Sequence, residues 1–207
     1  MIDAACDEAL TEAFYEARRA ELEARLPKKG RFRHCLGVAD TACRLARRYG
    51  ADERKARLAG LLHDWDKGYD DEGIRARARE LGLEVDPFVM ERMPQLLHGP
   101  TAAAALGRAF PQLPADVLRA IERHTAGAAG MTDLDMVVYI ADVIEPGRDF
   151  PGVAGLRKLV GKGTLEELFV EVSGHVLANL VERRRFVHPG TLEVWNYYIA
   201  RRKGLDG

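Results

Sequence analysis

The stretch "LAGLLHDWDKG", from Leu58 to Gly68, places a histidine and an aspartate side by side at the end of an apolar helical run. Lys67 follows one helical turn after His63 and Asp64. An unpaired carboxylate in a hydrophobic core is costly, so polar side chains at these positions need a partner in the folded protein. The stretch therefore predicts a helix that ends in a chemically active pair.

The residues before this pair form a stripe of small side chains. Ala56, Ala59, Gly60, His63 and Lys67 are separated by three or four positions, which places them along one face of a helix. Small residues on that face allow another helix to approach closely. We expect this helix to pack against a neighbour and to carry the His-Asp pair into the core.

The same helical period continues along nearly the whole chain. Apolar residues recur at intervals of three and four, and no long stretch alternates with the strand period of two. The sequence predicts an all-α fold with Gly50 ending one helix, Asp52 capping the next, and a Thr132/Asp135 capping box. The expected helices lie at roughly 3–26, 31–49, 53–67, 72–82, 96–110, 114–127, 132–146 and 164–186, and from 191 onward.

Composition limits the class of protein. The 207 residues, of which 47% are apolar and 30% charged, suit one compact domain. Lys and Arg number 31 against 32 Asp and Glu, so no overall field attracts nucleic acid or an anionic membrane. No apolar run is long enough to span a membrane and the acidic start is unlike a signal peptide, so we expect a cytoplasmic protein.

The three cysteines are expected to be free thiols, with Cys35 and Cys43 buried on one helix.

The six histidines divide into two groups. Any single histidine on a helix is more often structural than ligating, and His175 and His188 are interpreted in that way. The other four occur in a fixed order with two aspartates, each in a helix or at its end. Four imidazoles and two carboxylates suit iron, manganese or zinc better than magnesium or calcium, which prefer oxygen ligands. The ordered set is His34, His63, Asp64, His98, His124 and Asp142.

Five ordered motifs carry a resemblance to a known family. The segments "RHCLGVADTACRLARRYG", "AGLLHDWDKG", "LLHGPTAA", "IERHTAG" and "VVYIADVIEPGRDFPGV" resemble the HD superfamily of metal-dependent phosphohydrolases, and within it the YqeK branch. The resemblance implies an HD-domain helical bundle in a single domain, 1–207. Its HD core covers about 31–153, with an N-terminal helix in 1–30 and C-terminal helices in 154–207. The implied activity is symmetrical hydrolysis of diadenosine tetraphosphate to two ADP at a di-iron centre.

The resemblance also implies a role for each ligand position. His34, His63, Asp64 and Asp142 match the ligands of a first metal, and His98 and His124 match those of a second. Asp64 would bridge the two ions, since a carboxylate has two oxygens. We expect two transition-metal ions, with iron as the first choice and manganese or zinc as alternatives. Hydroxide bridging the metals would then attack phosphorus.

Further residues are expected to contact the substrate. Lys67 matches the lysine of the branch's HDxxK motif and is assigned, with Asp64, to catalysis and, as a phosphate clamp, to substrate binding. Glu145 and Arg148 are expected to bind substrate or orient ligands, and weaker candidates lie beside two of the histidines. Asp66 is interpreted as a capping or surface residue, with a hydrogen bond to a ligating histidine as the alternative. The expected substrate-binding set is Arg33, Lys67, Thr125, Glu145 and Arg148.

Two other functions remain open from the sequence. One is an HD-type nucleotidase that acts on mononucleotides or deoxynucleotides, because the sequence does not give the shape of the pocket. The other is a non-enzymatic sensor or interaction module that uses metal only to fold. The expected partner is a dinucleoside polyphosphate or another nucleotide, with no nucleic acid and no membrane. The oligomeric state is left open, with a homodimer as one option.

Overall fold

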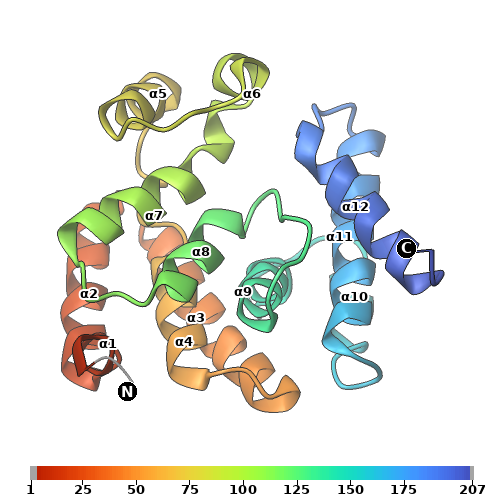
Figure 1. Ribbon diagram of the computed structural model, residues 1–207, viewed down its shortest axis with the longest axis horizontal. Helices are drawn as coiled ribbons and strands as arrows, with labels where there is room; N and C mark the ends of the chain where they lie inside the picture. Colours follow the sequence, from red (N-terminus) through yellow and green to blue (C-terminus); the bar gives the residue numbers. More distant parts are fainter. Residues whose placement is uncertain (1–3, 206–207) are drawn as a thin grey trace.

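The structure is a computed structural model that describes residues 4–205, with side chains from residue 7 onward. This part of the chain is helical throughout and contains no strand, so the all-α prediction is confirmed (Figure 1). The elements are α1 (Ala4–Ala9), α2 (Glu12–Arg25), α3 (Lys29–Tyr49), α4 (Glu53–Leu62), α5 (Asp71–Glu80), α6 (Pro87–Arg92), the 3-10 turn η1 (Pro94–Leu96), α7 (His98–Ala109), α8 (Ala115–Arg123), α9 (Asp133–Ile144), α10 (Val153–Arg157), α11 (Leu165–Glu182) and α12 (Pro189–Arg202).

The predicted helix caps are confirmed. Gly50 ends α3 in the left-handed conformation, with φ of 85°. The side chain of Asp52 accepts hydrogen bonds from the first backbone amides of α4. Thr132 and Asp135 form the reciprocal capping box of α9. These local signals therefore set the end of α3 and the starts of α4 and α9.

Several predicted helix boundaries differ from the structure. The first helix is split, because Thr11 accepts a hydrogen bond from the amide of Phe14 and starts a new helix. The helix of the His-Asp pair ends at Leu62, so Lys67 lies in the turn that follows it. The long helix after Thr164 ends at Glu182, and two short helices, α6 and α10, lie in segments where none was expected.

Helices α3, α4 and α9 form the centre of the fold. A Cβ atom on Gly60 of α4 would lie 2.9 Å from the Cα of Ala39 on α3, so only glycine permits this approach. The prediction of a close helix contact along the small-residue stripe is therefore confirmed. Helix α9 is buried on all sides, including its central Val137, Val138 and Ile140. Removing this apolar surface from water is the main force that holds the three helices together.

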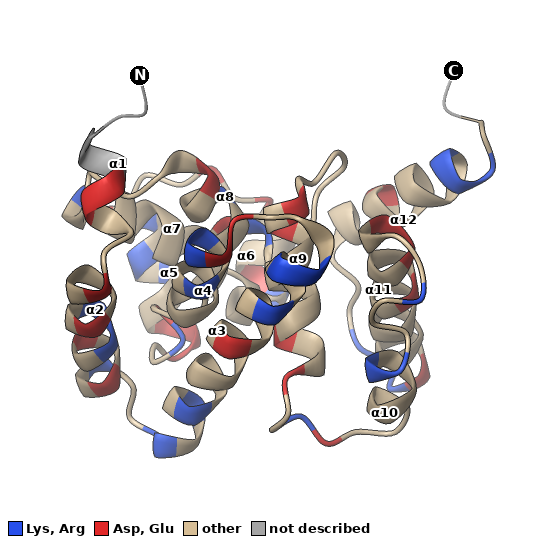
Figure 2. Cartoon of the chain, turned by 90° about the horizontal axis from the view of Figure 1, so that it is seen from below, with Lys and Arg blue, Asp and Glu red and all other residues tan. Residues whose placement is uncertain are grey.

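The remaining helices surround this centre. Helices α11 and α12 pack together beside α9, and α5, α6 and η1 form a separate layer at the opposite side of the cleft described below (Figure 1). That layer has its own small core, which includes Ile74, Val89 and Leu97. Acidic and basic positions are interspersed over the helices (Figure 2). Among the described residues, no helix combines the length and apolarity needed to cross a membrane.

The cysteines agree only in part with the expectation. Cys35 and Cys43 are free, and both lie on α3. Cys35 is fully buried, and burial raises the pKa of its thiol well above the usual value. Cys43 is half-buried rather than buried, because it lies at the edge of the α3–α4 contact. The side chain of Cys6 lies outside the described residues.

Candidate metal centre

The six expected ligand residues are brought together from five helices. His34 comes from the first half of α3, and Asp142 from the last turn of α9. The other positions are at helix ends: His63 and Asp64 directly follow α4, His98 is the first residue of α7, and His124 directly follows α8. Their donor atoms form three overlapping groups, each within 4.8 Å: His34, His63 and Asp64; His63, His124 and Asp142; Asp64, His98 and His124.

Three of the four histidines are oriented by the same local contact. The Nδ1 of His63 donates to the carbonyl of Gly60 at 2.7 Å, three residues earlier in the chain. His98 and His124 make the same contact with the carbonyls three residues before them, also at 2.7 Å. A carbonyl oxygen accepts only, so each ring carries its proton on Nδ1 and has a lone pair on Nε2. All three Nε2 atoms then point into the cluster.

His34 has a different partner for its Nδ1. This nitrogen lies 3.0 Å from Oε1 of Glu145, the buried residue that ends α9. Gly37, one turn after His34, leaves the space for that carboxylate, because a Cβ atom there would lie 2.5 Å from Oε2 of Glu145. Glu145 therefore holds the ring of His34 and does not line the cleft of the site. Of the two roles expected for Glu145, this contact favours the orientation of a ligand over substrate binding, because the carboxylate is buried against the ring.

The two carboxylate oxygens of Asp64 face different histidines. Oδ2 lies 3.4 Å from Nε2 of His63 and 3.9 Å from Nε2 of His34. Oδ1 lies 3.1 Å from Nε2 of His98 and 4.0 Å from Nε2 of His124. Asp64 therefore lies between the two sets of ligands, where one carboxylate can serve both.

Burial favours the neutral, ligating form of two imidazoles. It lowers the pKa of His98, and it lowers the pKa of His124 to about 3. Burial acts in the same direction on His63, but the charge and hydrogen bond of Asp64, together with the charge of Asp142, raise the pKa of this ring above its usual value. The imidazole rings of His98 and His124 are therefore uncharged at neutral pH.

The carboxylates stay ionised in spite of their burial. Burial opposes the charge of Asp64, but the histidines around it hold the pKa of its carboxyl well below the usual range. Burial also opposes the charge of Asp142, but the hydrogen bond with His34 and the charges of His63 and Arg148 together hold the pKa of that carboxyl well below its usual range. The site therefore concentrates negative charge and imidazole lone pairs in a space that is largely closed to water.

This arrangement fits metal cations. The Nε2 atoms of His98 and His124 lie 3.0 Å apart, and both rings use their proton on a backbone carbonyl. Two lone pairs facing each other at this distance repel unless a cation lies between or beside them. The Nε2 of His63 is buried and lacks a hydrogen-bond partner among the described residues. Both observations match the needs of a bound cation.

Three cationic side chains surround the cluster. The Nη1 of Arg31 lies 3.0 Å from Oδ2 of Asp64, and the Nζ of Lys67 lies 3.1 Å from Nδ1 of His98. The guanidinium of Arg148 donates a hydrogen bond from Nη2 to Oδ1 of Asp142. The backbone of Arg148 is held in place by Arg157, whose Nη2 donates to the Arg148 carbonyl at 2.8 Å. Burial lowers the pKa of Lys67, since the charge of its ammonium is partly removed from water. A phosphate chain at the cluster would meet positive charge from three directions.

Arg31 is the functional candidate that the sequence analysis missed. It lies three residues before His34 and therefore on the same face of α3. Arg33, which was expected at the site, is exposed, and consecutive helix positions point about 100° apart. Arg33 instead lines a separate hollow beside His34, together with Glu145. The i, i+3 spacing from His34 was the signal that could have identified Arg31.

Asp66 is also placed differently from the expectation. Its carboxylate is fully buried and lies 3.2 Å from Arg25 of α2 and 3.5 Å from Arg77 of α5. The interpretation as a capping or surface residue is wrong, because two helices distant in sequence cover it. Asp66 therefore ties the turn that carries the His-Asp pair to both neighbouring helices.

A cleft of about 650 Å³ opens beside the cluster. His124, Thr125 and Asp142 line its inner end. Its walls come from the segment around α6 and η1 on one side and from residues 185–191 on the other. Phe88 and Phe186 touch across these walls, with ring centroids 5.3 Å apart. The cleft is large enough for a nucleotide.

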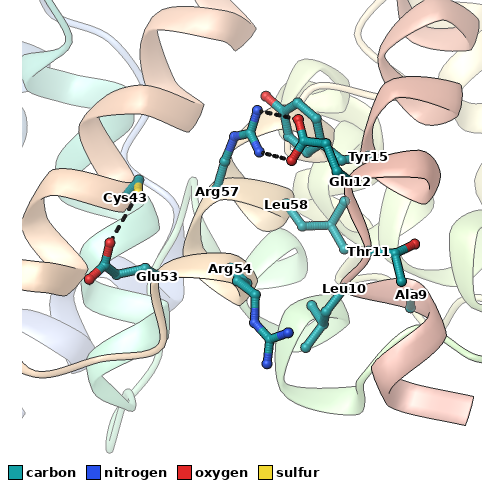
Figure 3. Close-up of a pocket in the computed structure, with 10 residues that line it drawn as sticks. All are labelled: Ala9, Leu10, Thr11, Glu12, Tyr15, Cys43, Glu53, Arg54, Arg57 and Leu58. Carbon is teal, nitrogen blue, oxygen red and sulfur yellow. Dashed lines mark hydrogen bonds and ion pairs between the residues drawn. The ribbon is translucent and has the colours of Figure 1, made fainter. Parts of the chain in front are cut away.

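Another hollow, of about 320 Å³, lies between the start of α2 and helices α3 and α4 (Figure 3). Its charged groups pair with one another, since Arg57 makes two hydrogen bonds to the carboxylate of Glu12. The guanidinium of Arg57 also lies 3.7 Å from the ring centre of Tyr15. None of the predicted site residues lines this hollow. It is separate from the His and Asp cluster.

Comparison with known proteins places the chain in a family. The HD domain family matches residues 31–147. The symmetrical bis(5'-nucleosyl)-tetraphosphatase of Staphylococcus aureus is 38% identical over 187 residues, which cover 88% of this chain and 93% of that protein. The protein of the same name from Bacillus subtilis is 35% identical over 171 residues, covering 82% and 90%.

A solved structure shows the same fold. The protein from Clostridium acetobutylicum, described as a predicted HD superfamily hydrolase involved in NAD metabolism, superposes with a TM-score of 0.84. It is 37% identical in sequence, and the match covers 90% of this chain and 97% of that one. The similarity therefore extends beyond the HD core to most of the flanking helices.

Proposed function

The chain belongs to the HD domain family, and we propose that it is a metal-dependent phosphohydrolase that cleaves diadenosine tetraphosphate symmetrically into two ADP molecules. The relatives from S. aureus and B. subtilis bear the name of this activity and align with more than four fifths of the chain. The observation that carries the proposal is the convergence of four imidazoles and two ionised carboxylates at the end of a nucleotide-sized cleft.

We assign two metal ions to this cluster. His34, His63, Asp64 and Asp142 would hold one ion, and Asp64, His98 and His124 would hold the other. When bound, such a metal pair activates water as a nucleophile and offsets the charge that builds up on the phosphate oxygens. Iron is the proposed metal, with manganese and zinc as alternatives, and the nitrogen-rich donor set supports a first-row transition metal. A cytoplasmic location is proposed from the sequence alone.

The side chains around the cluster would position the phosphate chain. Lys67 and Arg148 lie on opposite sides of it, next to His98 and Asp142 respectively. If each binds the oxygens of a different phosphate, the middle of the tetraphosphate lies over Asp64. Arg31 is in position to neutralise a further phosphate oxygen, since it already pairs with the carboxylate of Asp64. Cleavage at the centre of the substrate follows from this placement of charge.

The test is product analysis with metal-loaded protein. Incubation with diadenosine tetraphosphate and Fe(II) or Mn(II) is expected to yield ADP alone, measured by chromatography. AMP together with ATP would contradict the symmetrical geometry. Parallel incubations with mononucleotides and deoxynucleotides test the related HD nucleotidase function, which predicts faster turnover of those substrates.

A further inference from the structure

We propose that the hollow between α11 and residues 148–150 is a subsite for the second nucleoside of the dinucleoside substrate. This inference rests on the proposed function. The hollow has a volume of about 290 Å³ and includes five polar or aromatic side chains in its lining: Arg148, Phe150, His175, Asn179 and Arg183. No role in the reaction has been assigned above to this part of α11.

The hollow adjoins the main cleft. Val143, Val176 and Leu180 line both spaces. The ligand residue Asp142 lines the cleft, and Arg148, which contacts Asp142, lines the hollow. The Asp142 side of the metal centre therefore lies next to both spaces, in the cleft directly and at the hollow through Arg148.

Symmetrical cleavage needs two such spaces. When the reacting bond is at the middle of the tetraphosphate, one nucleoside lies on each side of the metal centre. The main cleft can take only one of them without bending the phosphate chain back on itself. The hollow, close to the lower limit of about 300 Å³ for small-molecule sites, suits a single nucleoside.

The side chains of α11 have the chemistry for this ligand. His175, Asn179 and Arg183 are four residues apart, so they form one stripe along the helix. The amide of Asn179 can both donate to and accept from the edge of a base. The guanidinium groups of Arg148 and Arg183 complement the phosphates that link the base to the metal centre.

An aromatic surface completes the hollow. The rings of Phe150 and His175 have centroids 5.3 Å apart and are inclined by only 30°, which is close to parallel stacking. Bases stack readily on such side chains. The Nε2 of His175 is buried and has no hydrogen-bond partner within the described part of the chain, so a turn of the ring toward a ligand breaks no existing bond.

The test compares two substrates with the same phosphate chain. Diadenosine tetraphosphate carries two nucleosides, and adenosine 5'-tetraphosphate carries one. With the metal-loaded protein we expect a KM about tenfold lower for the dinucleoside, in the range that one stacked base provides. Phe150→Ala and Asn179→Leu are expected to raise the KM for the dinucleoside about tenfold. Both variants should keep kcat/KM for adenosine tetraphosphate within about twofold of the original value.

Ser173→Ala is the matched control. Ser173 lies on α11 two residues before His175, its hydroxyl donates to the carbonyl of Val170, and it lines neither space. This variant should leave the KM of both substrates unchanged. Turnover of adenosine tetraphosphate by each variant reports that the fold and the metal centre are intact. If Phe150→Ala does not fold, Asn179→Leu alone decides, because it replaces a half-buried amide by a side chain of similar size.

The outcomes separate the two proposals. Equal KM values for the two substrates in the unmodified protein would overturn the second subsite. An equal rise in the KM of both substrates in the Phe150 and Asn179 variants would overturn it too. If the metal-loaded protein hydrolyses neither substrate, the proposed function itself fails and the subsite fails with it. A selective loss of affinity for the dinucleoside supports both.

Discussion

The Nδ1 of His34 lies 3.0 Å from Oε1 of Glu145, although the two residues are 111 positions apart. The other three histidines of the cluster use a carbonyl three residues away, which any helix end supplies. His34 lies inside a helix, where the backbone carbonyls are already used, so its ring needs a partner from another element. Glu145 supplies it and therefore links the position of His34 to the end of α9.

Loss of Glu145 is therefore expected to weaken metal binding. Glu145→Ala should lower the affinity of the first metal about 10- to 100-fold, the usual effect of losing a side chain that orients a ligand. Competition with a chromogenic chelator measures this affinity. Glu145→Gln keeps an oxygen acceptor and should restore part of it. Glu122→Gln on the exposed face of α8 is the control, and equal losses in the two glutamine variants would contradict the role of Glu145.

Asp64 is expected to be the least replaceable residue of the cluster, because its two oxygens face both sets of histidines. Asp64→Ala should lose metal and activity together. Elemental analysis of the purified variant measures the metal, and His175→Ala is the control for metal content. If His175→Ala lost as much metal as Asp64→Ala, the assignment of the histidines would be wrong.

The unmodified protein should hold close to two transition-metal ions per chain. Two ions account for all six donor residues and for the facing lone pairs of His98 and His124. Removal of the metal with a chelator should lower the melting temperature, because metal bound only to the folded chain stabilises it. Fully loaded protein with only one ion per chain would refute the shared role of Asp64.

Lys67 should act on the transition state rather than on the metal. Lys67→Ala removes one preorganised positive charge, and we expect a loss of about 2 to 4 kcal/mol in transition-state binding, read from kcat/KM. The metal content should not change. Lys162→Ala, on an exposed turn before α11, is the control. Normal turnover by Lys67→Ala would exclude the phosphate clamp.

Asp66 should contribute to stability. Asp66→Ala removes the buried carboxylate between Arg25 and Arg77, and we expect a loss of about 1 to 3 kcal/mol in the free energy of unfolding. Both arginines are partly exposed, which keeps the loss below that of a fully buried pair. Urea unfolding measures it. Glu80→Ala removes only an exposed partner of Arg77 and should cost less than about 1 kcal/mol, so an equal loss in both variants would contradict this role.

Local signals account for what the sequence predicted correctly. The caps at Gly50, Asp52 and Thr132 depend on contacts within four residues, and the structure has all three. The stripe of small residues around Gly60 depends only on the helical period. The break at Thr11 is local as well, because its side chain caps the amide of Phe14 three residues later, but the helical period of the apolar residues runs on across it.

The sequence by itself determined the helical fold and the ordered set of histidines and aspartates, because helical periodicity, capping and the choice of metal-ligating residue types are all written within short segments. Only the tertiary structure decided which atoms meet. It placed Arg31 at the cluster instead of Arg33, turned Glu145 onto His34, buried Asp66 between two arginines, and set the hollow on α11 beside the main cleft. These relationships join residues up to 111 positions apart, and they depend on the packing of whole helices, which fixes side-chain directions that no local spacing determines.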